Sequence, residues 1–316
     1  MMIMDVDLKS KVDIFKDYYK DISRTLIFDN NKVKILENLL YVINKNEVDK
    51  NELKSIRKYI SKSELNNVFN GNVKKAMSAF LCSNFQYEKI VKDTIIIYDN
   101  LVNKGFKKDK YLELLSFIIT LRFHKKEYDN LLNNMLKAKT EIKSKVQGID
   151  EFKLMNICFI NLSMFSREYD QLVKKYLKIY FKLLRKNFDK KEAFFIALAM
   201  INLDEIDYTS YINNVMEIKS HLNNTKMEIK EEHYLLLGLS SLIIENNSEF
   251  IDNISEVYDD LCEKRLIKKD QIVLVSITLV LYEYIEIISE DDEDLFTENE
   301  INIVKKLIEY LTLLLI

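Results

Sequence analysis

Proline is absent from this chain of 316 residues, and only four residues are glycine. Average usage would give about 16 prolines and roughly 20 glycines at this length. Proline breaks helix interiors and glycine weakens them, so a sequence poor in both favours helices almost throughout. We therefore expect an all-α protein.

Residues that bind metals or form disulfides are also scarce, with three histidines and three cysteines. Cys82, Cys158 and Cys262 lie far apart among apolar neighbours, without the spacing of a zinc site or a disulfide framework. We interpret them as small buried hydrophobic side chains in a reducing compartment. Glu217 and His221 share a helix face, but two ligands without a third indicate a surface pair. We expect no metal and no cofactor.

The glycines exclude one large class of enzymes. They stand alone at positions 71, 105, 148 and 238, so no glycine-rich loop can cradle a phosphate. The nucleophile motif G-x-S-x-G is absent as well. We expect a protein without catalytic activity.

Targeting signals are missing from the sequence. The first residues, MMIMDVDLKSKVD, include acids where a secretory signal needs a basic region and a long apolar core. The most apolar run, IVLVSITLVLY at 272–282, is too short to cross a bilayer and continues into Glu283 and Glu286. The sequence predicts a cytoplasmic protein with no membrane partner.

What the chain does contain is a repeat, in which residues 91–119 recur 82 residues later as 173–201. Weaker copies fall about halfway between and beyond, so the period is near 40 residues. Between 91–112 and 173–194 the identical residues are Val91, Lys92, Ile97, Tyr98, Leu101, Lys104, Phe106 and Lys108, matched by Val173, Lys174, Ile179, Tyr180, Leu183, Lys186, Phe188 and Lys190.

Each repeat pairs a charged helix with a more apolar one. The charged helices carry an anchor residue at one equivalent position: Tyr98, Ala138, Tyr180, Ile218 and Tyr258. The apolar helices are expected at 110–121, 192–201, 232–244 and 271–288. Two helices every 40 residues predict an α-solenoid of the HEAT-like or tetratricopeptide-like kind, with a right-handed superhelix.

No linker divides the chain, so we predict one domain over residues 1–316. Residues 1–45 are expected to form N-terminal capping helices and residues 48–288 the repeat array. Residues 297–316 form a last helix, which is either a C-terminal cap or a face for self-association.

Glycine and asparagine mark the helix ends. Gly105 and Asn187 follow the first helix of the two strong repeats, where a residue with positive φ belongs. Phe69-Asn70-Gly71 predicts the first clear break between helices. Gly238 lies inside LLLGLSS and predicts close helix packing rather than a break.

Two resemblances accompany the repeat. The segment IYDNLVNKGFKKDKYLELLSFI resembles the pentatricopeptide repeat, a family that reads single-stranded RNA, but its period is about 40 and the usual turn proline is absent. Over nearly its whole length the chain resembles a bacterial family of uncharacterised helical proteins. That family shares an F-x-G break, as at Phe69-Asn70-Gly71, and Y-x-x-L-x-x-x-G-[FI] units, as at Tyr98, Leu101, Gly105 and Phe106. This resemblance implies no activity.

Charge is distributed unevenly along the chain. Residues 101–200 carry 21 basic and 11 acidic side chains, whereas residues 201–316 carry 9 and 25. Lys174, Lys178 and Lys182 share one helical face with Arg185. This row is either a solvated outer face, a polyanion-binding stripe, or a surface that docks on a second copy or a protein partner.

The tyrosine anchors also admit two interpretations. Tyr98, Tyr180 and Tyr258 recur at one structural position, where they either pack between helices or form an aromatic ladder on a concave surface. The leading hypothesis is a protein- or peptide-binding module that uses Tyr98, Tyr180, Lys174, Lys178 and Lys182. The alternative is a nucleic-acid-binding helical-repeat protein that uses the basic residues 101–200.

Overall fold

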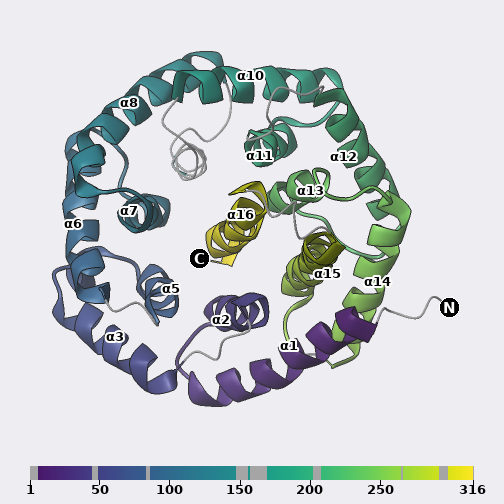
Figure 1. The fold of residues 1–316 in the computed structure, drawn as a ribbon, viewed down its shortest axis with the longest axis horizontal. Coiled ribbons are helices and arrows are strands. Elements are labelled where there is room, and N and C mark those ends of the chain that lie inside the picture. Colours follow the sequence, from purple (N-terminus) through teal and green to yellow (C-terminus); the bar gives the residue numbers. More distant parts are fainter. Residues whose placement is uncertain are drawn as a thin grey trace. The chain divides into compact units, whose positions relative to one another are not determined.

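A computed structural model describes residues 6–44, 49–82, 86–146, 156, 169–201, 208–264, 266–291 and 298–315. Throughout these ranges the regular elements are helices and none is a strand, which confirms the all-α prediction (Figure 1). Cys158, one of the three cysteines, lies outside these ranges.

The apolar helices predicted at 110–121, 192–201 and 271–288 occur, whereas the one predicted at 232–244 is an α-helix over residues 234–240. The α-helices are α1 (Val6–Thr25), α2 (Asn31–Asn44), α3 (Lys50–Lys62), α4 (Leu65–Val68), α5 (Gly71–Leu81), α6 (Tyr87–Asn103), α7 (Lys110–Arg122), α8 (Tyr128–Lys145), α10 (Tyr169–Arg185), α11 (Lys190–Met200), α12 (Tyr208–Leu222), α13 (Tyr234–Ser240), α14 (Asn247–Lys264), α15 (Lys269–Asp291) and α16 (Glu298–Leu315). Two short 3-10 helices are η1 (Lys125–Glu127) and η2 (Glu231–His233).

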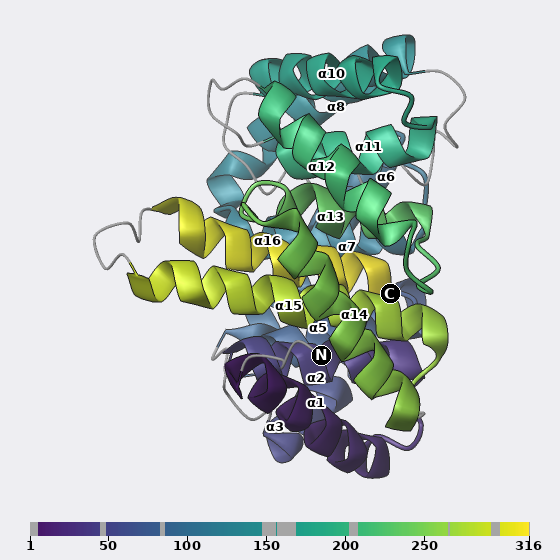
Figure 2. The same ribbon diagram turned by 90° about the vertical axis from the view of Figure 1, so that its right-hand side faces the viewer.

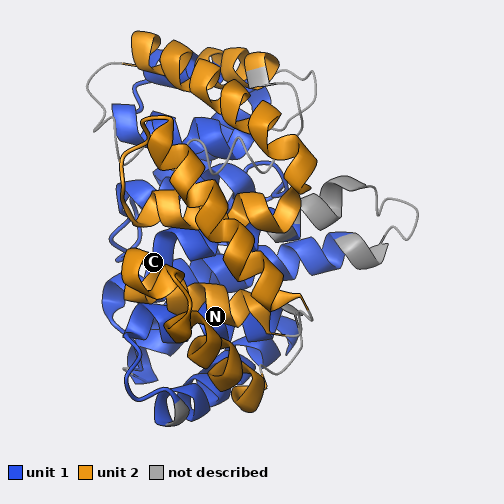
Figure 3. Ribbon diagram, turned by 90° about the vertical axis from the view of Figure 1, so that its left-hand side faces the viewer, with its two compact units in different colours: residues 1–46, 179–315 blue, residues 47–178, 316 orange. Residues whose placement is uncertain are grey.

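The helices group into two compact units (Figure 3). Unit 1 comprises residues 1–46 and 179–315, and unit 2 comprises residues 47–178 with residue 316. The boundary passes through α10, whose first ten residues belong to unit 2 and whose last seven belong to unit 1.

Unit 2 is built from charged helices that cover apolar ones. Helix α6 packs on α7, and α3 packs on α5. Helix α7 is apolar on nearly all sides, and every residue from Tyr111 to Ile119 is buried. A helix without a polar face is stable only inside a core, which explains why α7 lies beneath its neighbours.

Unit 1 repeats this layering. Helices α12, α14 and α1 form an outer row, and α11, α13, α15 and α2 form an inner row (Figure 1). The inner helix α11 is buried from Glu192 to Met200. The outer helices are amphipathic, with one solvent-exposed face and one buried face. Helix α14, for example, buries Phe250, Ile254, Val257 and Leu261 at helical spacing.

The last helix, α16, packs inside unit 1. It contacts α2, α13 and α15, and it lies side by side with α15 in Figure 2. Leu307, Leu311 and Leu315 are buried, and the fully buried Tyr310 donates a hydrogen bond to the carbonyl of Leu198, 3.4 Å away. The buried apolar side chains of α16 therefore pack within the chain, which suits the capping alternative, and the self-association alternative stays a prediction.

The first helices pack against the last ones. Lys11 of α1 forms ion pairs with Glu283 and with Glu286 of α15, the latter at 2.6 Å. The hydroxyl of Tyr282 donates to the carbonyl of Ile43 at 2.9 Å, which attaches α2 to the same helix. Lys16 adds an ion pair to Asp260 of α14. Each lysine therefore has more than one carboxylate partner, so these contacts form a network that joins α1 to α14 and α15.

The predicted helix ends are confirmed. Gly105 has φ of 81° and Asn187 has φ of 63°, both in the left-handed region. The next residue donates its N–H to the carbonyl five residues earlier, at 3.1 Å for Phe106 and 3.3 Å for Phe188. This 6→1 bond defines a Schellman motif, in which a left-handed residue ends the helix.

Each of these turns is covered by a lysine from the next charged helix. Lys139 of α8 lies 4.5 Å from the ring centre of Phe106 and donates to the carbonyl of Gly105 at 2.9 Å. Eighty residues later, Lys219 of α12 lies 5.0 Å from the ring centre of Phe188. Both copies of the sequence repeat therefore place a lysine in cation–π contact with the phenylalanine that follows the turn.

Gly238 provides a direct test of close helix packing. A Cβ atom there would lie 2.8 Å from Cβ of Ala199 and 3.2 Å from Cα of Ile196, both on α11. We expect Gly238→Ala to lower the free energy of unfolding by about 1–3 kcal/mol, because α13 must move away from α11. Urea unfolding followed by circular dichroism measures this change.

The matched control is Gly71→Ala. A Cβ atom at Gly71 meets nothing within 4 Å, so alanine should be neutral or stabilise by about 0.4–1 kcal/mol. Equal stability of the two variants would contradict close α11–α13 packing.

Candidate binding surface

The two tyrosines of the predicted site are buried. Tyr98 on α6 is 4% exposed and packs its ring 5.1 Å from that of Phe69, centre to centre. Tyr180 on α10 is 2% exposed and lies edge-on to Phe181 at 5.4 Å. Burial raises the pKa of both hydroxyls. Inter-helix packing accounts for these two side chains, and a role in binding stays a prediction.

The lysines of the predicted site lie along α10. Lys174 and Lys178 are exposed, whereas Lys182 is half-buried and donates to the hydroxyl of Thr209 at 2.6 Å. The exposed row continues through Phe181, which is 38% exposed, to Arg185. We call Lys174, Lys178, Phe181 and Arg185 the basic stripe.

The repeat does not require the basic stripe. Its equivalents on α6, 82 residues earlier, are Lys92, Ile96, Asp99 and Asn103. Only Lys174 has a counterpart of the same type, although both helices keep the buried tyrosine and phenylalanine. Packing between repeats therefore does not explain the charge or the exposed aromatic ring of the stripe.

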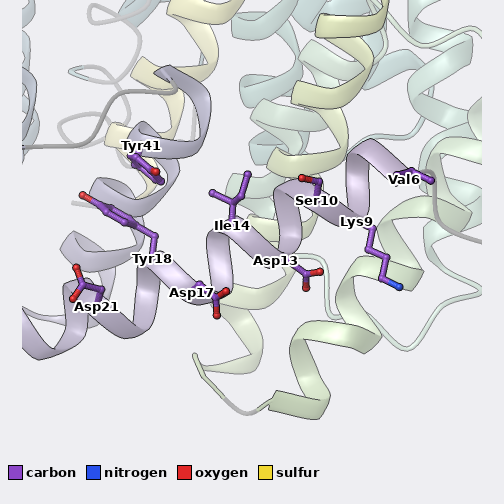
Figure 4. A pocket seen from close by; sticks show the side chains of 9 residues that line it. All are labelled: Val6, Lys9, Ser10, Asp13, Ile14, Asp17, Tyr18, Asp21 and Tyr41. Carbon is purple, nitrogen blue, oxygen red and sulfur yellow. The ribbon is translucent and has the colours of Figure 1, made fainter.

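A shallow depression of about 630 Å³ runs along α1 (Figure 4). Its floor is apolar, because Tyr18 of α1 stacks on Tyr41 of α2 with ring centres 3.9 Å apart, beside Ile14, which is 43% exposed. Its edge is acidic. We call it the α1 groove and define it by Asp13, Ile14, Asp17, Tyr18, Asp21 and Tyr41.

The acids of the α1 groove follow one line. Asp13, Asp17 and Asp21 are four residues apart and all exposed, so they share one face of α1. Lys16 lies 3.1 Å from Asp13, and Lys20 lies 2.9 Å from Asp17. The hydrogen bond from Lys20 lowers the pKa of Asp17, so this carboxylate is charged at neutral pH. The Lys20–Asp17 pair is exposed, and exposed ion pairs are weak and exchange readily with other cations. Lys16 is buried and also pairs with Asp260, so Asp13 interacts with a lysine that is held in place.

The α1 groove can hold a side chain that is both apolar and flanked by positive charge. Stacked tyrosines and an isoleucine offer flat apolar area, and carboxylates beside them select lysine or arginine. Sequence reasoning missed this surface because residues 1–100 as a whole carry an excess of basic side chains. The spacing of Asp13, Asp17 and Asp21 on the side of α1 opposite Phe15 and Tyr19 was the available signal.

Histidines and cysteines form no second site within the described residues. His221 lies 3.8 Å from Glu217, and both side chains are well exposed, as expected for a surface pair. No group of three metal-ligating side chains occurs in the part of the chain that the structure describes. Cys82 and Cys262 are half-buried, so they are less buried than the sequence interpretation expected.

Glu113 of α7 is the most perturbed carboxyl of unit 2. Burial raises its pKa to about 7, although its carboxylate accepts the N–H of Asn70 at 2.6 Å. Asn70 in turn caps α5 by accepting the N–H of Asn72 at 2.9 Å. The predicted break between helices at residues 69–71 is thus confirmed, and the hydrogen bond to Glu113 attaches this turn to α7. Its position indicates a structural role.

One described helix passes the length and composition test for crossing a membrane. Residues Lys269–Ile288 of α15 have a mean hydropathy of 1.8, and 78% of this window is buried inside the protein. Core helices of soluble proteins pass the same test, so the feature carries little weight. The predicted cytoplasmic location stays a prediction.

The fold and surface define an all-helical protein with an acidic groove on its first helix and a basic stripe on α10. Comparison with protein families identifies it further, since residues 18–308 match the family described as "Protein of unknown function (DUF4003)". The chain belongs to this family, which confirms the expected membership of an uncharacterised family. No curated protein and no solved structure matches the chain.

Glu113 gives a pH-dependent test of the α5–α7 junction. A carboxyl whose folded pKa is raised to about 7 stabilises the fold below its unfolded pKa of 4.5, and this stability is lost as the pH rises to 7. We expect Glu113→Gln, which cannot ionise but can still accept the Asn70 N–H, to be about 1–3 kcal/mol more stable than wild type at pH 8. At pH 4.5 the two should be nearly equal.

Urea unfolding at both pH values measures the difference. The control is Glu88→Gln on the exposed first turn of α6, whose stability should follow wild type across this range. An E113Q profile parallel to wild type would show that Glu113 is not held as a neutral acid.

Proposed function

We propose that this protein is a non-catalytic helical-repeat module that binds a protein or peptide in the cytoplasm. The α1 groove carries the proposal, because exposed apolar side chains lie there beside a row of carboxylates (Figure 4). Single exposed apolar residues are common on protein surfaces, but a stacked aromatic pair in a depression is typical of a peptide-binding surface.

We further propose that the chain is one α-solenoid of two-helix repeats of about 40 residues, with a right-handed superhelix. Support comes from the two Schellman turns. A lysine covers the phenylalanine of each turn, and these two lysines, Lys139 and Lys219, are 80 residues apart in the sequence. The anchors Tyr98, Ala138, Tyr180, Ile218 and Tyr258 add support because all are buried, one in each of α6, α8, α10, α12 and α14. Helical repeats provide extended surfaces that suit peptide partners.

Selection of displayed peptides on the full-length protein tests the binding function. We expect enrichment of peptides that combine lysine or arginine with an aromatic or aliphatic residue. Asp13→Lys with Asp17→Lys should weaken the selected peptides at least tenfold in fluorescence anisotropy, because attraction becomes repulsion. Asp252→Lys with Asp259→Lys, on the exposed face of α14, is the control of equal charge and should bind as wild type.

Two results would overturn the proposal. One is the absence of any selected peptide that binds above a scrambled control. The other is an equal change of peptide affinity in D13K/D17K and in the control D252K/D259K, because the α1 groove would then not be the binding site.

A nucleic-acid-binding function is the second candidate, and the basic stripe favours it. Lys174, Lys178 and Arg185 supply cations that could neutralise phosphates, and Phe181 could stack on a base. Six of the 47 basic residues are arginine, the residue best suited to bidentate phosphate contacts. This composition places nucleic acid second.

Binding to single-stranded RNA, measured across a range of salt, tests this candidate. If the basic stripe binds phosphate, Lys174→Glu with Lys178→Glu should weaken binding at least tenfold and flatten its salt dependence. Lys92→Glu with Lys137→Glu, two exposed lysines elsewhere, gives the control. Equal losses in both variants would indicate a nonspecific effect of net charge.

A further inference from the structure

We propose that the α1 groove binds the basic stripe of a second copy of this chain. The inference rests on the proposed binding function and names its partner. It follows from three observations. The charged residues of the two surfaces have similar spacing, their charges are opposite, and each charged row includes an exposed apolar residue.

The spacing of the two rows is similar. Asp13, Asp17 and Asp21 are four residues apart on α1, which places them at steps of about 6 Å along the helix. Lys174 and Lys178 are also four residues apart on α10, and Arg185 lies seven residues further on. Two helices laid side by side can therefore bring Lys174 and Lys178 opposite successive aspartates. Long arginine and lysine side chains absorb the remaining offset at the third position.

The apolar residues fall at corresponding places. Phe181 lies between Lys178 and Arg185 and exposes 38% of its surface. The α1 groove offers Ile14 and the Tyr18–Tyr41 stack beside its aspartates. An aromatic ring that enters a shallow apolar depression, surrounded by charge pairs, has the arrangement of an interface anchor with a polar rim.

A second copy is the occupant that the chain itself supplies. The acidic groove and the basic stripe are on different helices of one polypeptide, so each copy has both halves of the contact. The repeat requires neither half, because α6 lacks the stripe at equivalent positions and the α1 acids lie on its solvent face. A contact between unlike surfaces is heterologous, and it leads to rings or open chains rather than to a two-fold dimer in which like meets like.

Sedimentation velocity of the full-length protein at low salt tests the proposal. Wild type should associate with increasing concentration, and about 0.5 M salt should disperse it because exposed charge pairs are screened. Asp13→Lys with Asp17→Lys should weaken association at least tenfold, and so should Lys174→Glu with Lys178→Glu. The controls D252K/D259K and K92E/K137E should associate as wild type.

Mixing the two site variants provides the decisive measurement. In D13K/D17K both surfaces are basic, and in K174E/K178E both are acidic, so neither variant can pair with itself. In a mixture, the acidic α1 groove of K174E/K178E can pair with the basic stripe of D13K/D17K. The basic groove of D13K/D17K can likewise pair with the acidic stripe of K174E/K178E. An equimolar mixture should therefore regain association that neither variant shows alone. Recovery in the mixture also demonstrates that both variants are folded.

Three outcomes would overturn the inference. The first is a wild-type protein that stays monomeric at all concentrations tested. The second is association that both site variants retain. The third is a larger species that disappears with nuclease, which would assign the basic stripe to nucleic acid. If wild type is monomeric but α1 still binds selected peptides, only the choice of partner fails and the proposed function stands.

Discussion

The helix-ending turn at Gly105 and Asn187 is the constraint on which the repeat depends. A left-handed residue turns the chain sharply at the end of the helix, and the phenylalanine after it is buried. A lysine of the next charged helix covers each phenylalanine ring, so the turn fixes both the end of one helix and the position of another. A β-branched residue at either left-handed position would strain the backbone and loosen both contacts together.

The turn also explains which residues recur and which do not. Tyr98 and Tyr180 recur because they fill the same space between helices, where volume and shape decide packing. Outward-facing residues of the same helices meet only solvent, so the repeat leaves them free to differ. The basic stripe on α10 and the acidic edge of α1 belong to this unconstrained set, and we therefore base the proposals on them.

Much of the fold was predictable from the sequence, because helix formation depends on local signals. The absence of proline, the apolar spacing and the turn residues predicted the helices and the left-handed positions of Gly105 and Asn187. The sequence could not show that Lys182 is held by Thr209, since that contact joins helices that the repeat period alone does not orient. Nor could it reveal that burial raises the pKa of Glu113, because that burial depends on helices such as α5 and α6 that pack against α7.

The contact between Lys11 and Glu283 joins residues 272 positions apart, which has a consequence for synthesis on the ribosome. At roughly 5–20 residues per second, α1 waits about 14–54 s before its partner on α15 has been translated. Unit 2 is nearly continuous in sequence, and its helices can pack during that interval. During that interval the faces of α1 and α2 that later pack on α15 and α16 lack these partners on the nascent chain.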